Sequence, residues 1–243
     1  MDNKQLTKLI AAMVLGDGFL GWRDAKKKSP RLAERPQYDK PINSWYGSAH
    51  IAKNRDYVEW QCEVLENVTS VSVREYEARQ STNGYIDAAK ITYETKRHPF
   101  FTPMRHRTYV NGIKTISPHD IKLFDAESLA ILYMDNGWNE EQGRIGIATH
   151  AYSWADNKFL RDCIAEQCGV HLNVRTHKQK NGSIKYYLRS NNEQGKVLKD
   201  IVYRTGLITP SFEYKLENSE RVAPAFLQDD DIVSSLGKYN QEG

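Results

Sequence analysis

Asp17 and Asn136 each stand directly before a glycine, at the end of two similar apolar segments. The first segment is IAAMVLGDG (Ile10 to Gly18) and the second is LAILYMDNG (Leu129 to Gly137). Each run indicates a helix that ends near its glycine, so the sequence offers one side-chain oxygen donor at each of two equivalent helix ends. Other common catalytic patterns are absent, because the chain has no GxxxxGKS/T phosphate loop, HExxH pair or GxSxG elbow.

Histidine and cysteine give no competing metal site. The three cysteines form no CxxC pair, which argues against both a disulfide framework and a four-cysteine zinc site. The seven histidines lack metal-ligand spacing, and we expect each to be structural or to contact phosphate rather than to bind zinc. They are His50, His98, His106, His119, His150, His171 and His177.

The repeated segments belong to a longer internal duplication. KNRDYVEWQCEVL and ADNKFLRDCIAEQ are two plausible amphipathic helices that place Cys62 on Cys163. Each is followed by a hairpin that turns on Asn-Gly, at Asn83 and at Asn181, the strongest short-range hairpin signal. RTYVNGIKTIS and IVYRTGLITPS complete the two units. This order predicts an α+β unit with an antiparallel sheet, made twice.

The duplication and the charge pattern divide the chain into three parts. We expect a first repeat over residues 1–115, a second over 116–216 and an acidic C-terminal tail over 217–243. The net charge is only +3, but the tail is acidic, which leaves 32 basic and 25 acidic side chains in the body. The first repeat contains an additional long basic loop over 23–45. Its cations are Arg23, Lys26, Lys27, Lys28, Arg31, Arg35 and Lys40.

Alternation along the second hairpin predicts one apolar and one basic sheet face. In GSIKYYLRS, Lys185, Tyr187 and Arg189 fall on one face, and the partner strand offers Arg175, His177 and Gln179 in step with one another. Such a face is common in solvated antiparallel sheets. Together with the duplication and the basic loop it favours DNA, because a two-stranded ribbon fits the major groove. On the first hairpin the corresponding candidates are Arg74 and Tyr76.

Over residues 5–216 the sequence resembles the LAGLIDADG homing endonucleases in their single-chain, two-motif form. IAAMVLGDG and LAILYMDNG match the nonapeptide that names the family, and HRTYVNGIKTIS and GLITPSFEYKL resemble further family segments. The resemblance implies two pseudo-symmetric αββαββα repeats whose antiparallel sheets form a saddle over DNA. It also implies a monomer that cuts both strands of a long target across the minor groove.

The resemblance also implies a site at the end of the two motif helices. Asp17 and Asn136, with the backbone carbonyls of Gly16 and Asp135, would bind Mg²⁺, for which Mn²⁺ or Ca²⁺ could substitute in binding. The bound ion would lower the pKa of the attacking water and stabilise charge on the scissile phosphate. The matching lysines, Lys114 and Lys215, would polarise the surrounding solvent.

Asn136 departs from the family pattern, which has a carboxylate there. A neutral ligand would bind a divalent ion more weakly, so cleavage could be slow or strand-biased, or the substitution could be engineered to trap uncut DNA. The alternative is a catalytically impaired DNA-binding protein or an RNA-splicing maturase on the same fold. The narrow major groove of A-form RNA makes RNA the less natural ligand.

Composition sets the remaining expectations. The mean hydropathy is -0.68 and no apolar run approaches the length of a membrane span, so we expect no membrane association. Unpaired cysteines and a DNA substrate suggest an intracellular, reducing compartment. Two motifs in one chain predict a protein that needs no protein partner.

Overall fold

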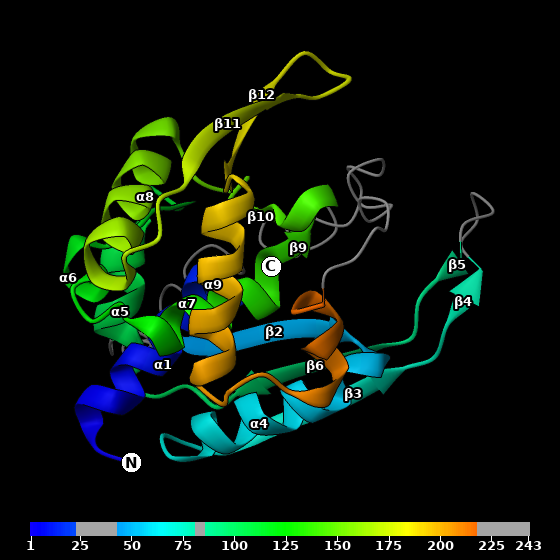
Figure 1. The fold of residues 1–243 in the computed structure, drawn as a ribbon. Coiled ribbons are helices and arrows are strands. Elements are labelled where there is room, and N and C mark those ends of the chain that lie inside the picture. Colours follow the sequence, from blue (N-terminus) through cyan, green and yellow to red (C-terminus); the bar gives the residue numbers. More distant parts are fainter. Residues whose placement is uncertain (23–42, 81–85, 218–243) are drawn as a thin grey trace.

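A computed structural model describes residues 1–22, 43–80 and 86–217, and it contains the predicted unit twice. Figure 1 shows the two units side by side around a pair of central helices. The first repeat contains α1 (Asn3–Leu15), β1 (Phe19–Gly21), β2 (Trp45–Ile51), α4 (Arg55–Glu66), β3 (Val71–Tyr76), β6 (Lys90–Thr95) and α5 (Phe101–Thr108). Short strands β4 (Arg79–Gln80) and β5 (Ile86–Asp87) extend its hairpin, and η2 (Ala52–Asn54) precedes α4.

The second repeat follows a short connection made of β7 (Tyr109–Val110), β8 (Ile113–Lys114) and α6 (Pro118–Ile121). It contains α7 (Ala126–Asn136), β9 (Gly137–Asn139), η3 (Glu141–Gly143), β10 (Ile145–Ile147), α8 (Trp154–Cys168), β11 (Asn173–Lys178), β12 (Ile184–Arg189) and α9 (Asn192–Arg204). A final 3-10 segment, η4 (Pro210–Lys215), returns to the first repeat. The predicted α+β architecture with two αββαββα repeats is confirmed.

Strand order and register show which positions of the two repeats correspond. The sheets run β1-β2-β6-β3 and β9-β10-β12-β11, with antiparallel neighbours. Phe19 pairs with Gly47 and Trp138 pairs with Gly146, and in both pairs the aromatic ring covers the glycine. Phe19 therefore corresponds to Trp138. Counting back two residues places Asp17 opposite Asn136, as the sequence alignment predicted.

Polar caps set the starts of the two central helices. Asp2 accepts a hydrogen bond from the backbone nitrogen of Gln5 at the start of α1, and Asp125 accepts one from Ser128 at the start of α7. Such caps satisfy amide groups that have no partner inside the helix. Residues 129–134 of α7 are fully buried, which is the expected environment for a helix that is apolar on all sides.

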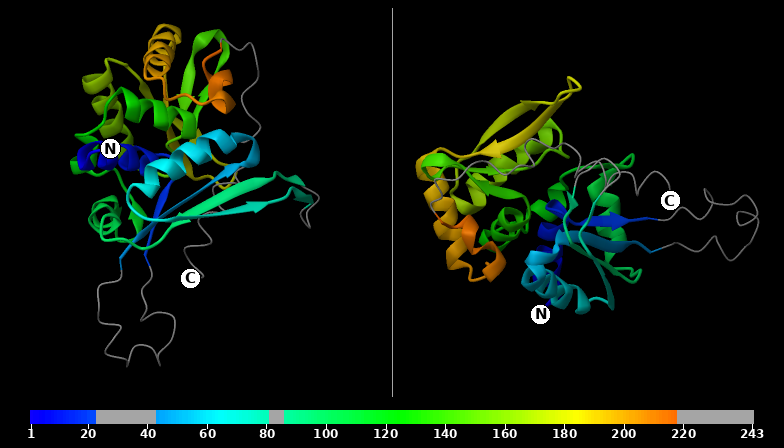
Figure 2. Two further views of the ribbon diagram at one scale, coloured as in Figure 1. Left: turned by 90° about the horizontal axis from the view of Figure 1, so that it is seen from below. Right: turned by 90° about the vertical axis from the view of Figure 1, so that its right-hand side faces the viewer.

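The two hydrophobic cores meet along the contact between α1 and α7. Ile131 and Met134 of α7 contribute to the core of the first repeat, and Leu15 from α1 contributes to the core of the second. Helix α4 covers one face of the first sheet and α8 covers one face of the second, as Figure 2 also shows. Within the described residues, no helix covers the opposite face of either sheet. The packing therefore fixes the two helix ends relative to both sheets.

The second hairpin turns where its Asn-Gly signal predicted. Gly182 has a φ of 84°, and the backbone nitrogen of Gln179 donates to Ser183 O at 2.9 Å. The equivalent turn at Asn83 and Gly84 lies outside the described residues, as do most of the basic loop and of the acidic tail. Among the helices that are described, none combines the length and the apolar character needed to cross a membrane.

Candidate active site

Helices α1 and α7 pack side by side and bring two aspartates together where they end. Ala12 and Ala130 are buried, and small side chains allow helix backbones to approach closely. Gly16 and Asp135, which correspond by register, are in direct contact. A Cβ at Gly16 would lie 2.0 Å from Asp135 Oδ2, so the close approach requires glycine.

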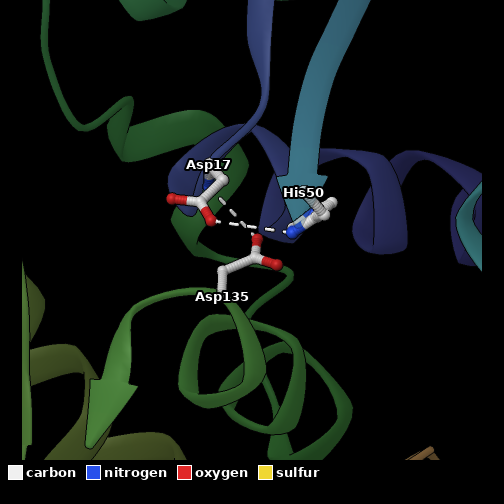
Figure 3. A group of neighbouring side chains, drawn as sticks. All are labelled: Asp17, His50 and Asp135. Atoms are coloured by element: carbon white, nitrogen blue, oxygen red, sulfur yellow. Dashed lines mark hydrogen bonds and ion pairs between the residues drawn. The ribbon is translucent and has the colours of Figure 1, made fainter. Parts of the chain in front are cut away.

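Asp17, Asp135 and His50 form a compact cluster at this point (Figure 3). One potential ligand atom from each residue lies within 4.8 Å of the others. The backbone nitrogen of Asp17 donates to Asp135 Oδ2 at 3.2 Å, and His50 Nδ1 lies 4.0 Å from Asp17 Oδ2. The three side chains come from the end of α1, the end of α7 and strand β2. Neither helix alone could build this cluster.

The position of the Asp135 side chain differs from the sequence-based expectation. That expectation gave Asp135 a role through its backbone carbonyl, yet its carboxylate points at Asp17. Tyr57, fully buried on α4, donates a hydrogen bond from its hydroxyl to Asp135 Oδ1 at 2.8 Å. The physical reason is the neighbouring glycine: Gly16 has no side chain, so the space beside it accepts the carboxylate of its counterpart. Asp135 thus brings a second carboxylate to the cluster.

Asn136 also contacts Asp17, but through its amide nitrogen. Asn136 Nδ2 donates to Asp17 Oδ1 at 3.1 Å. Oxygen and nitrogen of an amide can exchange places by a 180° rotation of the group, so this side chain can offer either a donor or an acceptor to the same point. In the arrangement observed it holds the Asp17 carboxylate in place.

The two predicted lysines lie beside the cluster and bind the ends of the motif helices. Lys114 Nζ donates to the carbonyls of Gly16 and Gly18, both at 3.0 Å. Lys215 Nζ donates to the carbonyls of Tyr133 at 3.2 Å and Met134 at 2.5 Å. Burial lowers the pKa of each lysine to about 8, although the nearby aspartates act in the opposite direction. The resemblance therefore selected two lysines that the fold brings to the same site.

Electrostatics makes this site suited to a cation. Asp17 and Asp135 lie at helix C-termini, where the backbone dipoles already place negative potential. The pKa of Asp135 is raised by burial and then by the charge of Asp17, while Tyr57 and Lys215 lower it. Two carboxylates in such a place repel each other, and a divalent cation between them would relieve the repulsion. Their hard oxygen donors match the ligand preference of Mg²⁺.

The second sheet presents most of its predicted DNA-contacting residues on one face. Arg175 pairs with Tyr187 and His177 pairs with Lys185 across β11 and β12, so all four side chains share that face. Tyr187 packs against Trp138, and its ring also contacts His150. Gln179 lies just beyond β11, in the turn. The face joins cations with aromatic rings, as the alternation predicted.

Arg189 lies on the same face but has an acidic partner. Its guanidinium donates to Glu140 from Nε, at 2.7 Å to Oε2, and from a terminal nitrogen. On the first sheet, Arg74 and Tyr76 are exposed on β3, and Lys90 lies 5.6 Å from the Tyr76 ring centre. The seven cations expected in the basic loop lie outside the described residues. They are Arg23, Lys26, Lys27, Lys28, Arg31, Arg35 and Lys40.

Two residues of the site carried no recognisable signal in the sequence. His50 was expected to be structural or to contact phosphate, and Tyr57 was one of fourteen tyrosines. The strand register and the helix packing bring both residues to the site. Residue spacing in the sequence therefore could not predict that they belong to it. The duplication could not help either, because His50 corresponds to Thr149 in the second repeat. Thr149 instead hydrogen bonds to Asn157.

Comparison with known proteins identifies the fold and the family. The protein resembles the homing endonuclease I-WcaI bound to its DNA recognition sequence, with a TM-score of 0.69, 17% identity and coverage of 89% of this chain and 88% of that one. The fold is thus that of a homing endonuclease. The sequence pattern of the LAGLIDADG DNA endonuclease family matches residues 10–198. The chain belongs to this family.

Two further proteins are similar to this chain. I-SmaMI bound to uncleaved DNA target in the presence of calcium ions gives a TM-score of 0.41 and 12% identity, over 97% of this chain and 92% of that one. The protein RecA of Mycolicibacterium chitae is 26% identical over an alignment of 243 positions that covers 92% of this chain and 50% of that protein. The chain spans about half the length of this curated relative.

Proposed function

We propose that the protein is a site-specific, metal-dependent endonuclease that cuts double-stranded DNA and acts as a monomer. The observation that carries the proposal is the carboxylate pair: Asp17 and Asp135 meet at the ends of the two motif helices, within reach of one ion. Family membership supports DNA as the substrate, and the DNA-bound state of I-WcaI supports the open sheet faces as the binding surface.

Asp17 and Asp135 would hold the ion, with Asn136 and the Gly16 carbonyl as further oxygen donors. Mg²⁺ is the ion we propose, and Mn²⁺ or Ca²⁺ would compete for the same oxygens. A bound divalent ion supplies Lewis-acid chemistry: it acidifies water and stabilises negative charge on phosphate. Asn136 orients Asp17 through its hydrogen bond, and Tyr57 orients Asp135 in the same way.

Lys114 and Lys215 would neutralise the charge that develops on the scissile phosphate. With pKa values of about 8, both are mainly protonated at pH 7. Their hydrogen bonds to helix-terminal carbonyls fix their positions before substrate arrives. Preorganised charge of this kind needs no rearrangement during the reaction, which is why it contributes strongly to catalysis.

The sheet faces would read and hold the DNA. Arg175, His177, Gln179, Lys185 and Tyr187 are proposed contacts of the second repeat, and Arg74 and Tyr76 are proposed contacts of the first. Arg189 and the seven basic-loop cations complete the proposed contact set. Strand side chains would contact base edges, while lysine and arginine would bind phosphates.

The binding-only alternative rested on the missing carboxylate at Asn136. The carboxylate of Asp135 removes the main reason for it, because two acidic groups are present at the site. The geometry still supports strand-biased cutting, because the two carboxylates differ in exposure. Asp135 is enclosed by Tyr57 and Gly16, whereas the side chain of Asp17 is about one-third exposed. The two strands would therefore meet unlike halves of the site.

A cleavage assay tests the proposal. The full chain is incubated with a duplex library of candidate target sites and Mg²⁺ or Mn²⁺, alongside Asp17→Asn and a control in which the exposed Asp162 is changed to Asn. We expect metal-dependent cutting by the native chain and the control, and loss of at least about a hundredfold in rate in Asp17→Asn. Cutting that persists in Asp17→Asn, or specific binding with no cutting by the native chain, would overturn the proposal.

A further inference from the structure

We propose that His50 is a third protein ligand at the site of Asp17 and Asp135, and that its imidazole shifts the site towards Mn²⁺-like transition ions over Mg²⁺. The inference rests on the proposed function, because it requires the two aspartates to hold an ion. It adds a nitrogen donor from β2 to a set otherwise made of oxygen atoms.

The position of His50 supports a ligand role. Its side chain is 4% exposed, and Nδ1 faces Asp17 Oδ2 at 4.0 Å, which is too long for a hydrogen bond. Two ligands bound about 2.1 Å from one ion can be at most about 4.2 Å apart. In this cluster the potential ligand atoms lie within 4.8 Å of one another, which is only slightly more than that maximum. A small closure of the three side chains would therefore bring them around one ion.

The imidazole is held in this orientation by its neighbours. Its ring stacks on Tyr93 with an interplanar angle of 17°, and it meets Tyr57 edge to face with ring centres 5.3 Å apart. Its backbone pairs with Ile91 in the sheet. A ligand fixed by packing on a strand loses little freedom on binding. Tyr57 contacts both His50 and Asp135, so one residue positions two of the proposed ligands.

The two repeats differ at the position of His50, because only the first repeat has a histidine there. Its counterpart Thr149 instead satisfies a buried hydrogen bond with Asn157. The imidazole therefore distinguishes one half of the site, the half that also contains Asp17.

Ligand chemistry predicts the preference. Mg²⁺ and Ca²⁺ favour oxygen ligands almost entirely, whereas imidazole suits first-row transition ions, whose affinity for a site with a nitrogen ligand rises from Mn²⁺ towards Cu²⁺. Two carboxylates and one imidazole thus favour Mn²⁺ over Mg²⁺. His50 is uncharged when it acts as a ligand, and burial, which lowers its pKa, favours that form. The aspartates supply the negative charge that binds a divalent ion, and the imidazole supplies the preference for Mn²⁺ over Mg²⁺.

Pulsed electron paramagnetic resonance on the full chain with one equivalent of Mn²⁺ tests the inference directly. Coupling of the Mn²⁺ electron spins to an imidazole ¹⁴N nucleus is expected in the native chain. It should be lost in His50→Gln and retained in His171→Gln, which changes an exposed histidine of the second repeat. Calorimetric titration should show tighter binding of Mn²⁺ than of Mg²⁺, with the ratio about tenfold smaller in His50→Gln.

The outcomes separate the inference from the function on which it rests. If Mn²⁺ binds, binding requires Asp17, and no nitrogen coupling is seen in the native chain, the ligand role of His50 is wrong while the carboxylate site stands. If Asp17→Asn leaves Mn²⁺ binding unchanged, both are wrong. The native spectrum decides even if His50→Gln fails to fold, because the coupling is measured in the unaltered chain.

Discussion

The carboxylate of Asp135 occupies the space that a side chain at Gly16 would need. These two residues are structural counterparts in the two repeats, and a Cβ at Gly16 would come within 2.0 Å of Asp135 Oδ2. The pseudo-symmetric helices thus meet through an unlike pair, one residue with no side chain and one with a carboxylate. This contact explains how a site with Asn136 can still contain two acids.

Gly16→Ala should therefore displace Asp135. We expect Mg²⁺ affinity and cleavage rate to fall at least about tenfold, since the proposed ligand would leave its position. A double-mutant cycle measures the coupling: in an Asp135→Ala background, Gly16→Ala should cost almost nothing more. Equal losses in both backgrounds would show that the contact has no role.

Tyr57→Phe should change the pH dependence of metal binding. The Tyr57 hydroxyl lowers the pKa of Asp135 by donating to its carboxylate, so its removal raises that pKa. A larger fraction of Asp135 is then protonated at pH 7, and Mg²⁺ affinity falls. Raising the pH should restore it, which a series of calorimetric titrations between pH 6 and about 9 would show. A uniform loss at every pH would contradict this role.

The lysines should impose an upper pH limit on cleavage. Burial lowers the pKa of Lys114 and Lys215 to about 8, so their charge is lost as the pH rises through that value. The cleavage rate should decline there, and Lys114→Gln or Lys215→Gln should be slow and should flatten the decline. A native rate that stays constant up to pH 10 would refute the role of their charge.

The contribution of these lysines to stability should rise with pH, whereas the cleavage rate should fall. In the unfolded chain a lysine has a pKa of about 10.4, so between about 8 and 10.4 the unfolded state binds more protons at these two positions. Their contribution to the free energy of unfolding therefore rises with pH across that window. Comparing the native chain with the lysine-to-glutamine variants in chemical denaturation isolates this contribution.

DNA binding should distinguish two arginines of the same sheet face. Arg175 is exposed, whereas Arg189 is paired with Glu140. Arg175→Gln should lower the slope of log affinity against log salt by about 1, the value for one phosphate contact. Arg189→Gln should change the slope less, because its charge is already neutralised. Equal changes would show that the Glu140 ion pair breaks on binding.

Much of the fold could be predicted because the sequence contains an internal duplication. Two motif helices, the Asn-Gly turn of the second hairpin and the alternation of β12 all have local signals, and the described residues contain the elements they predict. Asp17 follows from its place at the end of a repeated apolar segment, whereas Lys114 and Lys215 follow from the family resemblance. The structure places all three around the meeting point of α1 and α7.

The remaining parts of the site depend on contacts between distant segments. The direction of the Asp135 side chain follows from the absence of a side chain at Gly16, 119 positions earlier. Tyr57 reaches Asp135 only because α4 packs beside the helix ends, and His50 arrives from β2. The ion pair of Arg189 also depends on a residue 49 positions away. Periodicity and spacing describe single elements, so they could not predict these pairings.

The most direct test of the central claim, that Asp17 and Asp135 form the carboxylate pair, compares Asp135→Asn with Asn136→Asp in one Mg²⁺-dependent cleavage assay on a cognate duplex. We predict that Asp135→Asn loses at least about a hundredfold in rate while it retains DNA binding, and that Asn136→Asp still cuts. Undiminished cutting by Asp135→Asn would contradict the claim, as would a chain that cuts only after Asn136→Asp.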